Sequence, residues 1–473
     1  MLPKVLKITE LKENVSTAAV FDNLNQVDTS FLKQPESDFL NKKLEKENDC
    51  FIHKYPILYF FSKIINEKEK HLQKEQARKA GAKLFEQLKN DKINKLQVLN
   101  YSHEYLLEPF IEGILLAGYH FSKYKKEKKE FALKELFVFN QNISDQQLQE
   151  LQHVVQAVFH ARDLVNEPLS FLTAVQFSKE MEKLGKEAGF SVEVFQKKKI
   201  EALKMGGLLA VNKGSIDPPT FNILEWKPEN SKNDKPVILI GKGVVYDTGG
   251  LSLKPTPKSM DYMKSDMAGA AVVAATVYAV AKNKLPIHVV GLIPATDNRP
   301  DGNAYVPGDV ITMFDGTTVE IKNTDAEGRL ILADALSYAK KYNPKLVIDV
   351  ATLTGSAEII AGRHAIVGMS NTPEKLRELK VLGDELYERI VEVPLWEEFA
   401  EPLKSNIADL NNLGVREGQT SIAGKFLEHF TGYPWIHLDA AGVSFYHTQK
   451  PYLPEGGTGM GTRLLFNFLK KFN

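Results

Sequence analysis

The pattern of apolar and polar positions is most regular in the second part of the chain, from residue 191 onward. Short apolar runs there predict strands at Ser191–Phe195, Gly207–Val211, Phe221–Trp226, Val237–Gly241, His288–Ile293 and Leu346–Val350. Several of these runs are nearly continuous, which is typical of a sheet buried on both faces. Between them, Ala268–Lys282 and Arg329–Tyr342 carry apolar residues at helical spacing. The order of strand, helix and strand predicts an α/β domain with a mostly parallel central sheet flanked by helices.

The first part of the chain, residues 1–144, is rich in lysine and shows shorter patterns. Apolar stretches at Phe51–Phe61, Leu96–Asn100 and Glu135–Asn140 are typical of strands. Glu108–Lys123 repeats its apolar residues every three to four positions, which predicts a helix. We therefore expect a separate N-terminal α/β domain.

A long helix is predicted to link the two parts. Ser144–Gln147 has the sequence of a capping box, which opens a helix. The apolar pattern that follows stops before Pro168, because proline disfavours the helical conformation at the residue before it. We therefore expect an N-terminal domain at 1–144, a linking helix at 145–168 and a larger C-terminal catalytic domain at 169–473.

Composition and charge exclude several classes of protein. The 473 residues are ample for two domains, and 60 basic residues balance 60 acidic ones. A net charge of zero gives no global attraction toward nucleic acid or an anionic membrane. The single cysteine, Cys50, permits neither an intrachain disulfide nor a cysteine-based zinc site. No apolar run of about 18 residues and no apolar signal core is present, so we expect a soluble, cytoplasmic protein.

The segment Asn323–Leu330 carries the first candidate chemistry. Asp325, Glu327 and Arg329 occupy every second position, between an alternating pattern and a helical one. Residues at i and i+2 of an extended segment point the same way, so the two acids are expected to converge beside helix N–H groups. Close carboxylates repel each other unless a cation lies between them, which favours a metal site. The alternative is a solvated turn with a capping acid.

Further candidate ligands follow apolar runs upstream. Val237–Gly241 leads directly into Lys242, with Asp247 five residues later, and Asp266 precedes a helix of small residues. Ligand sites in parallel sheets lie at the carboxyl ends of the strands, so these residues are expected to cluster with Asp325 and Glu327.

The charges of this cluster suit two metal ions. Four carboxylates balance two divalent cations, and oxygen ligands suit Zn²⁺, Mn²⁺, Mg²⁺ or Co²⁺. Lys242 can join them as a neutral amine ligand, because adjacent dications favour the uncharged form. Lys254 and Arg329 then remain as cations near the metals.

Three blocks of sequence resemble those of the leucine aminopeptidase (cytosol aminopeptidase) family: Gly241–Gly250, Met263–Ala271 and Asn323–Leu330. The resemblance covers roughly residues 155–466 and includes Asn166–Pro168, Asn298–Asp309, Ala351–Gly355 and His437–Gly442. Tyr246, Ser265 and Ala268 differ slightly from common members, but no ligand position departs from the pattern.

The resemblance implies a hydrolytic mechanism with two divalent ions, Zn²⁺ or Mn²⁺ with Mg²⁺ or Co²⁺ as alternatives. The implied ligands are Lys242, Asp247, Asp266, Asp325 and Glu327. A water between the ions would be the nucleophile. Lys254 would stabilise the oxyanion, and Arg329 would hold a bicarbonate ion that acts as general base.

The resemblance also implies the substrate and the assembly. The free α-amine of a peptide would bind a metal, so that only the first residue is removed, as in a leucyl aminopeptidase. The pocket for that residue would be lined by Met263, Thr352, Gly355 and Ala441, whose apolar or small nature favours Leu- or Met-like residues. Core packing is the alternative role for these four. A cytoplasmic homohexamer with active sites facing an internal cavity is implied as well.

Two other classes of function stay open. A catalytically silent scaffold of the same fold is disfavoured because Lys254, Arg329 and all five ligands are intact. A nucleic-acid-binding protein that uses the Lys-rich N-terminal region is disfavoured by the neutral net charge and the interleaved acids.

Overall fold

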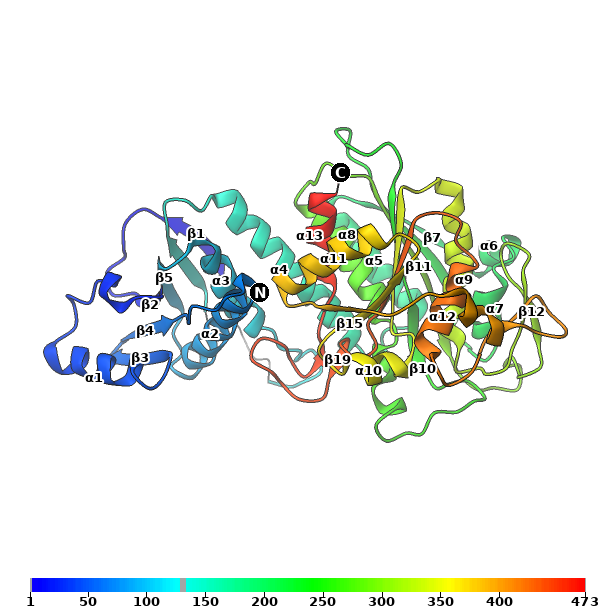
Figure 1. The fold of residues 1–473 in the computed structure, drawn as a ribbon, viewed down its shortest axis with the longest axis horizontal. Coiled ribbons are helices and arrows are strands. Elements are labelled where there is room, and N and C mark those ends of the chain that lie inside the picture. The colour runs from blue at the N-terminus through cyan, green and yellow to red at the C-terminus, as the bar shows by residue number, and fades with distance from the viewer. Residues whose placement is uncertain (1, 128–132, 473) are drawn as a thin grey trace. The chain divides into compact units, whose positions relative to one another are not determined.

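The computed structural model describes residues 2–127 and 133–472 (Figure 1). The chain divides into two compact units. The first comprises Met1–Gln156 with the short segments Glu385–Tyr387 and Thr448–Glu455, and the second comprises the remainder. Each unit contains its own sheet with helices, so the predicted α/β class is confirmed. The domain limits at residues 144 and 168 stay a prediction.

The first unit is built on a six-stranded sheet with the order β1-β6-β5-β2-β4-β3. Its strands are β1 Lys4–Ile8, β2 Ser16–Phe21, β3 Asp49–Lys54, β4 Ile57–Lys63, β5 Lys95–Tyr101 and β6 Glu135–Phe139. All neighbours are parallel except β3 and β4, which form a hairpin that contains the predicted stretch Phe51–Phe61.

Helices cover both faces of this sheet. Phe60 of β4 contacts Phe110 of α3 (Leu107–Ala117), at 6.3 Å between ring centroids. The next residue, Phe61, lies on the opposite face and shares a core with Leu40 of α1 (Gln34–Leu44). The helix α2 (Lys70–Asn90) packs closely on α3, since a Cβ at Gly113 would lie 2.0 Å from the carbonyl oxygen of Arg78. The predicted helix Glu108–Lys123 ends earlier than expected, at Ala117.

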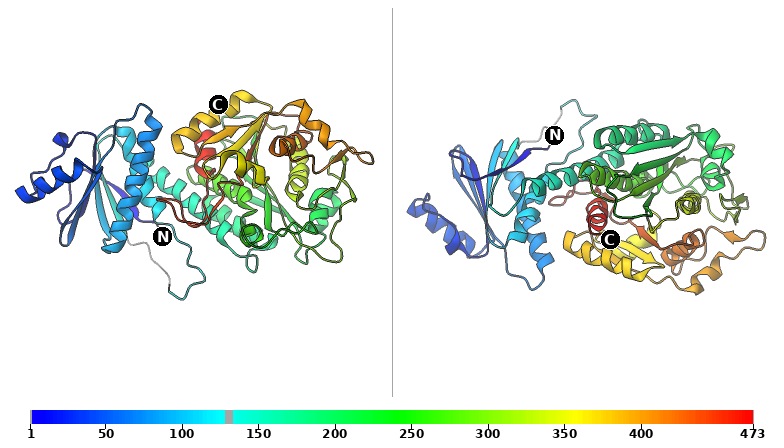
Figure 2. Two further views of the ribbon diagram at one scale, coloured as in Figure 1. Left: turned by 60° about the horizontal axis from the view of Figure 1, so that its bottom comes forward. Right: turned by 90° about the horizontal axis from the view of Figure 1, so that it is seen from above.

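The second unit is built on a nine-stranded sheet with the order β16-β15-β18-β14-β9-β11-β8-β7, and β10 pairs with β11. Figure 2 shows strands of this unit between its helices. The strands are β7 Ser191–Phe195, β8 Thr220–Trp226, β9 Val237–Gly241, β10 Gly243–Asp247, β11 Val289–Asn298, β14 Leu346–Ala351, β15 Ile366–Ser370, β16 Ile390–Glu392 and β18 Trp435–Asp439. The central strands β11, β9, β14 and β18 are parallel, as predicted. Two strands run in the opposite direction: β8, which is antiparallel to its neighbours β11 and β7, and β15, which is antiparallel to β18.

Two buried helices flank the central strands on opposite faces. Gly291 of β11 contacts side chains of α8 (Ala268–Lys282), while its neighbours Val290 and Leu292 share a core with Leu330 of α9 (Glu327–Ala339). Other helices are α4 Asp145–Asn166, α5 Ala174–Ala188, α10 Gly355–Ala361, α11 Pro373–Leu386, α12 Gln419–Glu428 and α13 Thr462–Lys471. Within the described ranges, no helix combines the length and apolar composition needed to cross a bilayer.

The backbone at the start of α8 packs directly against the backbone at the ends of β9 and β14. A Cβ at Gly241 would lie 2.4 Å from the Cα of Ala270, and a Cβ at Gly269 would lie 2.0 Å from the carbonyl oxygen of Val350. Only glycine permits these approaches. They bring the N-terminus of α8 to the carboxyl ends of β9 and β14.

One predicted strand is wrong. Gly207–Val211 lies within the helix α7 (Gly206–Asn212). A short continuous apolar run does not distinguish a buried strand from a buried helix by periodicity. Here the helix is selected by its surroundings, because the Asp334 carboxylate accepts the backbone N–H of Leu208 at 2.9 Å, in the first turn of α7.

Candidate metal centre and active site

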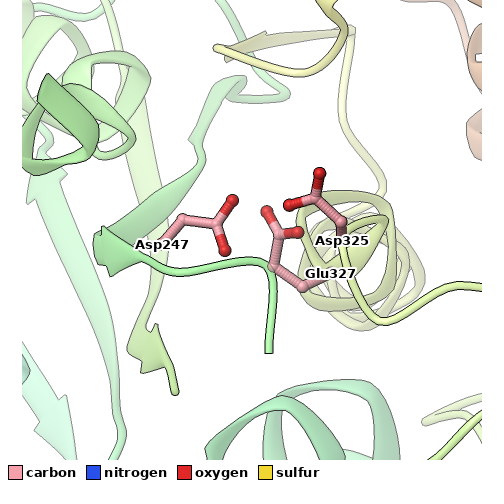
Figure 3. A group of neighbouring side chains, drawn as sticks. All are labelled: Asp247, Asp325 and Glu327. Carbon is pink, nitrogen blue, oxygen red and sulfur yellow. The ribbon is translucent and has the colours of Figure 1, made fainter. Parts of the chain in front are cut away.

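The predicted acids converge where strands end and α9 begins. Asp247 is the last residue of β10, and Glu327 is the first residue of α9. Asp325 lies in the turn just before that helix. Figure 3 shows the three carboxylates pointing toward one another. One carboxylate oxygen from each lies within 4.8 Å of the others.

Two lysines form ion pairs with these three acids and with Asp266. The Nζ of Lys242 is 2.9 Å from Asp266 Oδ1 and 2.8 Å from Glu327 Oε1. The Nζ of Lys254 is 2.9 Å from Asp247 Oδ2 and 2.5 Å from Asp325 Oδ1. All five predicted ligands therefore come together, with Lys254 among them.

The acids of the cluster are buried except Asp325, whose side chain is 31% exposed, and the cluster is short of positive charge. Four carboxylates against two ammonium groups leave a formal charge of −2. Burial raises the pKa of Asp266 well above its ordinary value, and burial with the nearby acids raises the pKa of Asp325 to about 7. Burial alone would lower the pKa of Lys242, but the surrounding carboxylates raise it, so the amine would lose its proton only to a dication bound beside it. Such a site favours additional cations.

The residues present fit divalent metal ions. Asp266 Oδ2 and Glu327 Oε2 are buried, and neither has a hydrogen-bond partner among the residues that the structure describes. A buried charged oxygen without a partner is costly, and carboxylate oxygens suit hard divalent cations. Gly328 leaves room for the amine ligand, because a Cβ there would lie 2.5 Å from the Cε of Lys242.

Arg329 does not share the ion pairs of the acid cluster, although it follows Glu327 by two residues. It occupies the first turn of α9, where successive residues rotate around the axis instead of alternating. Its side chain is buried, and within the described part of the chain it forms no ion pair. The nearest contacts are the Leu413 carbonyl oxygen, 3.4 Å from Nη1, and the ring of Phe426. Burial lowers the pKa of Arg329 to about 10, so the guanidinium stays charged at neutral pH.

The four predicted pocket residues lie on three segments of the chain. Hydrogen bonds of two buried residues, Asp266 and Asp439, connect these segments. Thr352 Oγ1 donates to Asp266 Oδ1 at 2.8 Å, and the Asp266 N–H donates to the Met263 carbonyl oxygen at 3.1 Å. The Asp439 carboxylate accepts the N–H groups of Leu353 and Ala441, at 3.1 and 3.2 Å.

These pocket residues differ from core residues in their exposure. Met263, Thr352 and Ala441 are half-buried, and Gly355 is exposed. A Cβ at Gly355 would meet no atom within 4 Å, so the space beside it is open. Their role in substrate binding stays a prediction.

Asn298 was missed as a site residue by reasoning from the sequence. Its Nδ2 donates to Asp247 Oδ1 at 2.8 Å and to the Thr324 carbonyl oxygen at 3.0 Å. Tyr305 was missed as well, and its hydroxyl donates to the same carbonyl oxygen at 2.7 Å. The available signals were the resemblance over Asn298–Asp309, which contains both residues, and, for Asn298, a polar residue that ends an apolar run.

Comparison with known families gives one match over most of the chain. The family model described as "Cytosol aminopeptidase family, catalytic domain" matches residues 159–466. A probable cytosol aminopeptidase of Chlorobium phaeobacteroides is 46% identical over 383 residues, which cover 78% of this chain and 75% of that protein. One from a Geobacter species is 41% identical over 366 residues, covering 76% and 74%.

Solved structures are similar over nearly the whole chain. The bottromycin maturation enzyme BotP in complex with Mn has a TM-score of 0.85 and 29% identity, covering 96% of this chain and 99% of that one. A mutant of tomato leucine aminopeptidase has a TM-score of 0.87 at 23% identity, covering 99% and 97%, which shows a shared fold.

Proposed function

This chain belongs to the cytosol aminopeptidase family, and we propose that it is a metal-dependent leucyl aminopeptidase that removes the first residue from peptides. The observation that carries the proposal is the cluster of four carboxylates around two lysines. Its unpartnered buried oxygens, Asp266 Oδ2 and Glu327 Oε2, support metal ligation.

Five residues would hold the two metal ions: Lys242, Asp247, Asp266, Asp325 and Glu327. Zn²⁺ or Mn²⁺ bound there would polarise the scissile carbonyl and lower the pKa of a bound water. The manganese complex of BotP supports Mn²⁺ as one of the candidates.

Lys254 is proposed to stabilise the oxyanion that forms at the scissile carbonyl. Burial alone would lower its pKa, but the Asp247, Glu327 and Asp325 carboxylates raise it above the ordinary value. The ammonium group is therefore a permanent hydrogen-bond donor. Its side chain keeps 15% of its surface exposed, so it borders space that a substrate can enter. Donors of this kind act mainly on the charge of the transition state.

Arg329 is proposed to hold a bicarbonate ion that serves as general base. Its buried guanidinium has no carboxylate partner within the described ranges, and its Nε has no hydrogen-bond partner there. A charged donor in this situation suits a small planar anion, which accepts two parallel N–H bonds from arginine.

The substrate is proposed to be a peptide with a free N-terminus and a Leu- or Met-like first residue. The α-amine would bind at the acid cluster, and the side chain would enter the space lined by Met263, Thr352, Gly355 and Ala441. We further propose a cytoplasmic homohexamer, with an N-terminal domain at 1–144, a linking helix at 145–168 and a catalytic domain at 169–473.

Metal dependence is the direct test. We expect a chelator to abolish hydrolysis of leucyl amides by the purified chain, and Mn²⁺ or Zn²⁺ to restore it. Full activity in a sample shown by elemental analysis to be metal-free would refute the proposal. No hydrolysis of any aminoacyl amide with either ion would favour a catalytically silent scaffold. Salt-sensitive retention of DNA would favour a nucleic-acid-binding protein.

A further inference from the structure

Asn298 lies at the meeting point of the two acid-bearing segments. It is the last residue of β11 and is fully buried. In the parallel pairing of β10 with β11, its register partner is Asp247. Its backbone carbonyl oxygen accepts two bonds from Thr248, at 3.0 Å from the N–H and 2.8 Å from the hydroxyl group. The backbone of Asn298 therefore fixes the turn that follows Asp247.

The side chain of Asn298 joins this turn to the segment that precedes α9. One amide nitrogen donates to Asp247 Oδ1 at 2.8 Å and to the Thr324 carbonyl oxygen at 3.0 Å. Thr324 directly precedes Asp325. A single –NH₂ group thus uses both of its hydrogens to connect two segments that lie far apart in the sequence.

Packing holds the amide in this orientation. Gly250 adopts a φ of +63°, and a Cβ there would lie 2.8 Å from Asn298 Oδ1 and 3.0 Å from Thr324 Oγ1. The Tyr305 hydroxyl donates to the same Thr324 carbonyl oxygen, which fixes that peptide group from a second side. Gly250 and Thr324 therefore pack directly against the Asn298 side chain.

The chemistry of an amide is suited to this position. Asp247 Oδ1 and the Thr324 carbonyl oxygen are both acceptors, so the residue between them must donate twice. An aspartate of the same shape would add a negative charge beside Asp247 and would present acceptors to acceptors.

We propose that Asn298 is a positioning residue that sets the separation of Asp247 and Asp325, and hence the affinity for the divalent ion that these two acids would share. The inference rests on the proposed function, because it requires that the cluster bind metal. It assigns a role to Asn298 that does not depend on contact with the ion or the substrate.

Asn222 of β8 provides a matched control. It is fully buried, its Nδ2 donates to the Ile293 carbonyl oxygen and the Thr220 hydroxyl group, and its Oδ1 is unpartnered within the described residues. Asn222→Asp therefore makes the same substitution in a similar environment away from the acids.

The experiment measures Mn²⁺ binding by calorimetry for the full chain, Asn298→Asp and Asn222→Asp. We expect two ions per parent chain, and a loss of about 10–100-fold in affinity at one of the two sites in Asn298→Asp. In saturating Mn²⁺, kcat for leucyl amide should fall while KM stays within about twofold of the parent. Asn222→Asp should lower the melting temperature but keep both affinities.

The outcomes separate the two proposals. If the parent binds two ions and Asn298→Asp binds both with parental affinity, the positioning role is wrong and the proposed function stands. An equal loss of affinity in Asn222→Asp would show a general effect of buried charge and would also overturn the positioning role. If the parent binds no ion, the proposed function fails, and the inference about Asn298 fails with it.

Discussion

Replacing Lys254 by alanine tests the charge balance of the cluster most directly. Its Nζ contacts Asp247 and Asp325, at 2.9 and 2.5 Å. Without it, these carboxylates and Glu327 face one another with oxygen atoms within 4.8 Å. At an effective dielectric constant of about 20, each pair of like charges at that distance repels by about 3.5 kcal/mol.

Protonation of an acid and movement of the side chains relieve part of this repulsion. Removing one partner of a buried ion pair typically costs about 3–5 kcal/mol. We therefore expect Lys254→Ala to lower the free energy of unfolding by about 3–5 kcal/mol in the presence of a chelator. A divalent ion replaces the lost positive charge, so saturating Mn²⁺ should reduce the difference to about 1 kcal/mol or less.

The assay is urea unfolding of the full chain with chelator and with Mn²⁺, beside kinetics on leucyl amide. Lys404→Ala is the control, because its side chain is 71% exposed and its ion pair with Glu401 is worth only about 0–1 kcal/mol. In Mn²⁺, Lys254→Ala should lower kcat by ~10²–10³ with little change in KM, and metal content should stay at two ions per chain.

Two results would refute this reasoning. An equal loss of stability with and without Mn²⁺ would mean that Lys254 does not compensate the acids. A kcat of Lys254→Ala close to that of the parent would show that Lys254 does not stabilise the transition state.

Three further predictions follow from the same structure. Acetylating the α-amine of the substrate should abolish cleavage, because that amine is a proposed metal ligand; comparable rates on acetylated peptides would exclude an exopeptidase. Arg329→Ala should lower kcat by ~10²–10⁴ and remove the rate increase that we expect from added bicarbonate, with metal content unchanged. A loss of metal from Arg329→Ala would show instead that Arg329 stabilises the turn and helix start that carry Asp325 and Glu327. Arg78→Ala should destabilise the first unit by about 3–5 kcal/mol in urea unfolding, because the buried Glu112 carboxylate loses a partner 2.6 Å away; a loss below 1 kcal/mol would contradict this.

The position of Asp247 was predictable from the sequence because residues that follow parallel strands meet at one edge of the sheet. Asp325 and Glu327 were predicted instead from their spacing at a junction of strand and helix, and they lie between β13 (Thr318–Glu320) of a separate three-stranded sheet and α9. The family resemblance, confirmed by the match over residues 159–466, supplied the ligand set and the proposed roles.

Features that depend on tertiary surroundings were not predictable. The apolar run Gly207–Val211 is a helix because Asp334, far along the chain, accepts an N–H group in its first turn. The direction of Arg329 depends on where α9 begins, and one residue of helix changes it by about 100°. Asn298 is found only once the register of β10 and β11 is known.

Gly241 at the end of β9 and Gly269 at the start of α8 limit which substitutions this junction accepts. Gly241 and Gly269 set backbone against backbone, and the Ala270 N–H donates to the Lys242 carbonyl oxygen at 3.1 Å. Side-chain packing yields by changing rotamers, whereas contacts between main chains have no such freedom. The spacing of Lys242 from the start of α8 is therefore stiff. We expect substitutions elsewhere in the core to reduce the yield of folded protein while the molecules that fold keep the parental geometry.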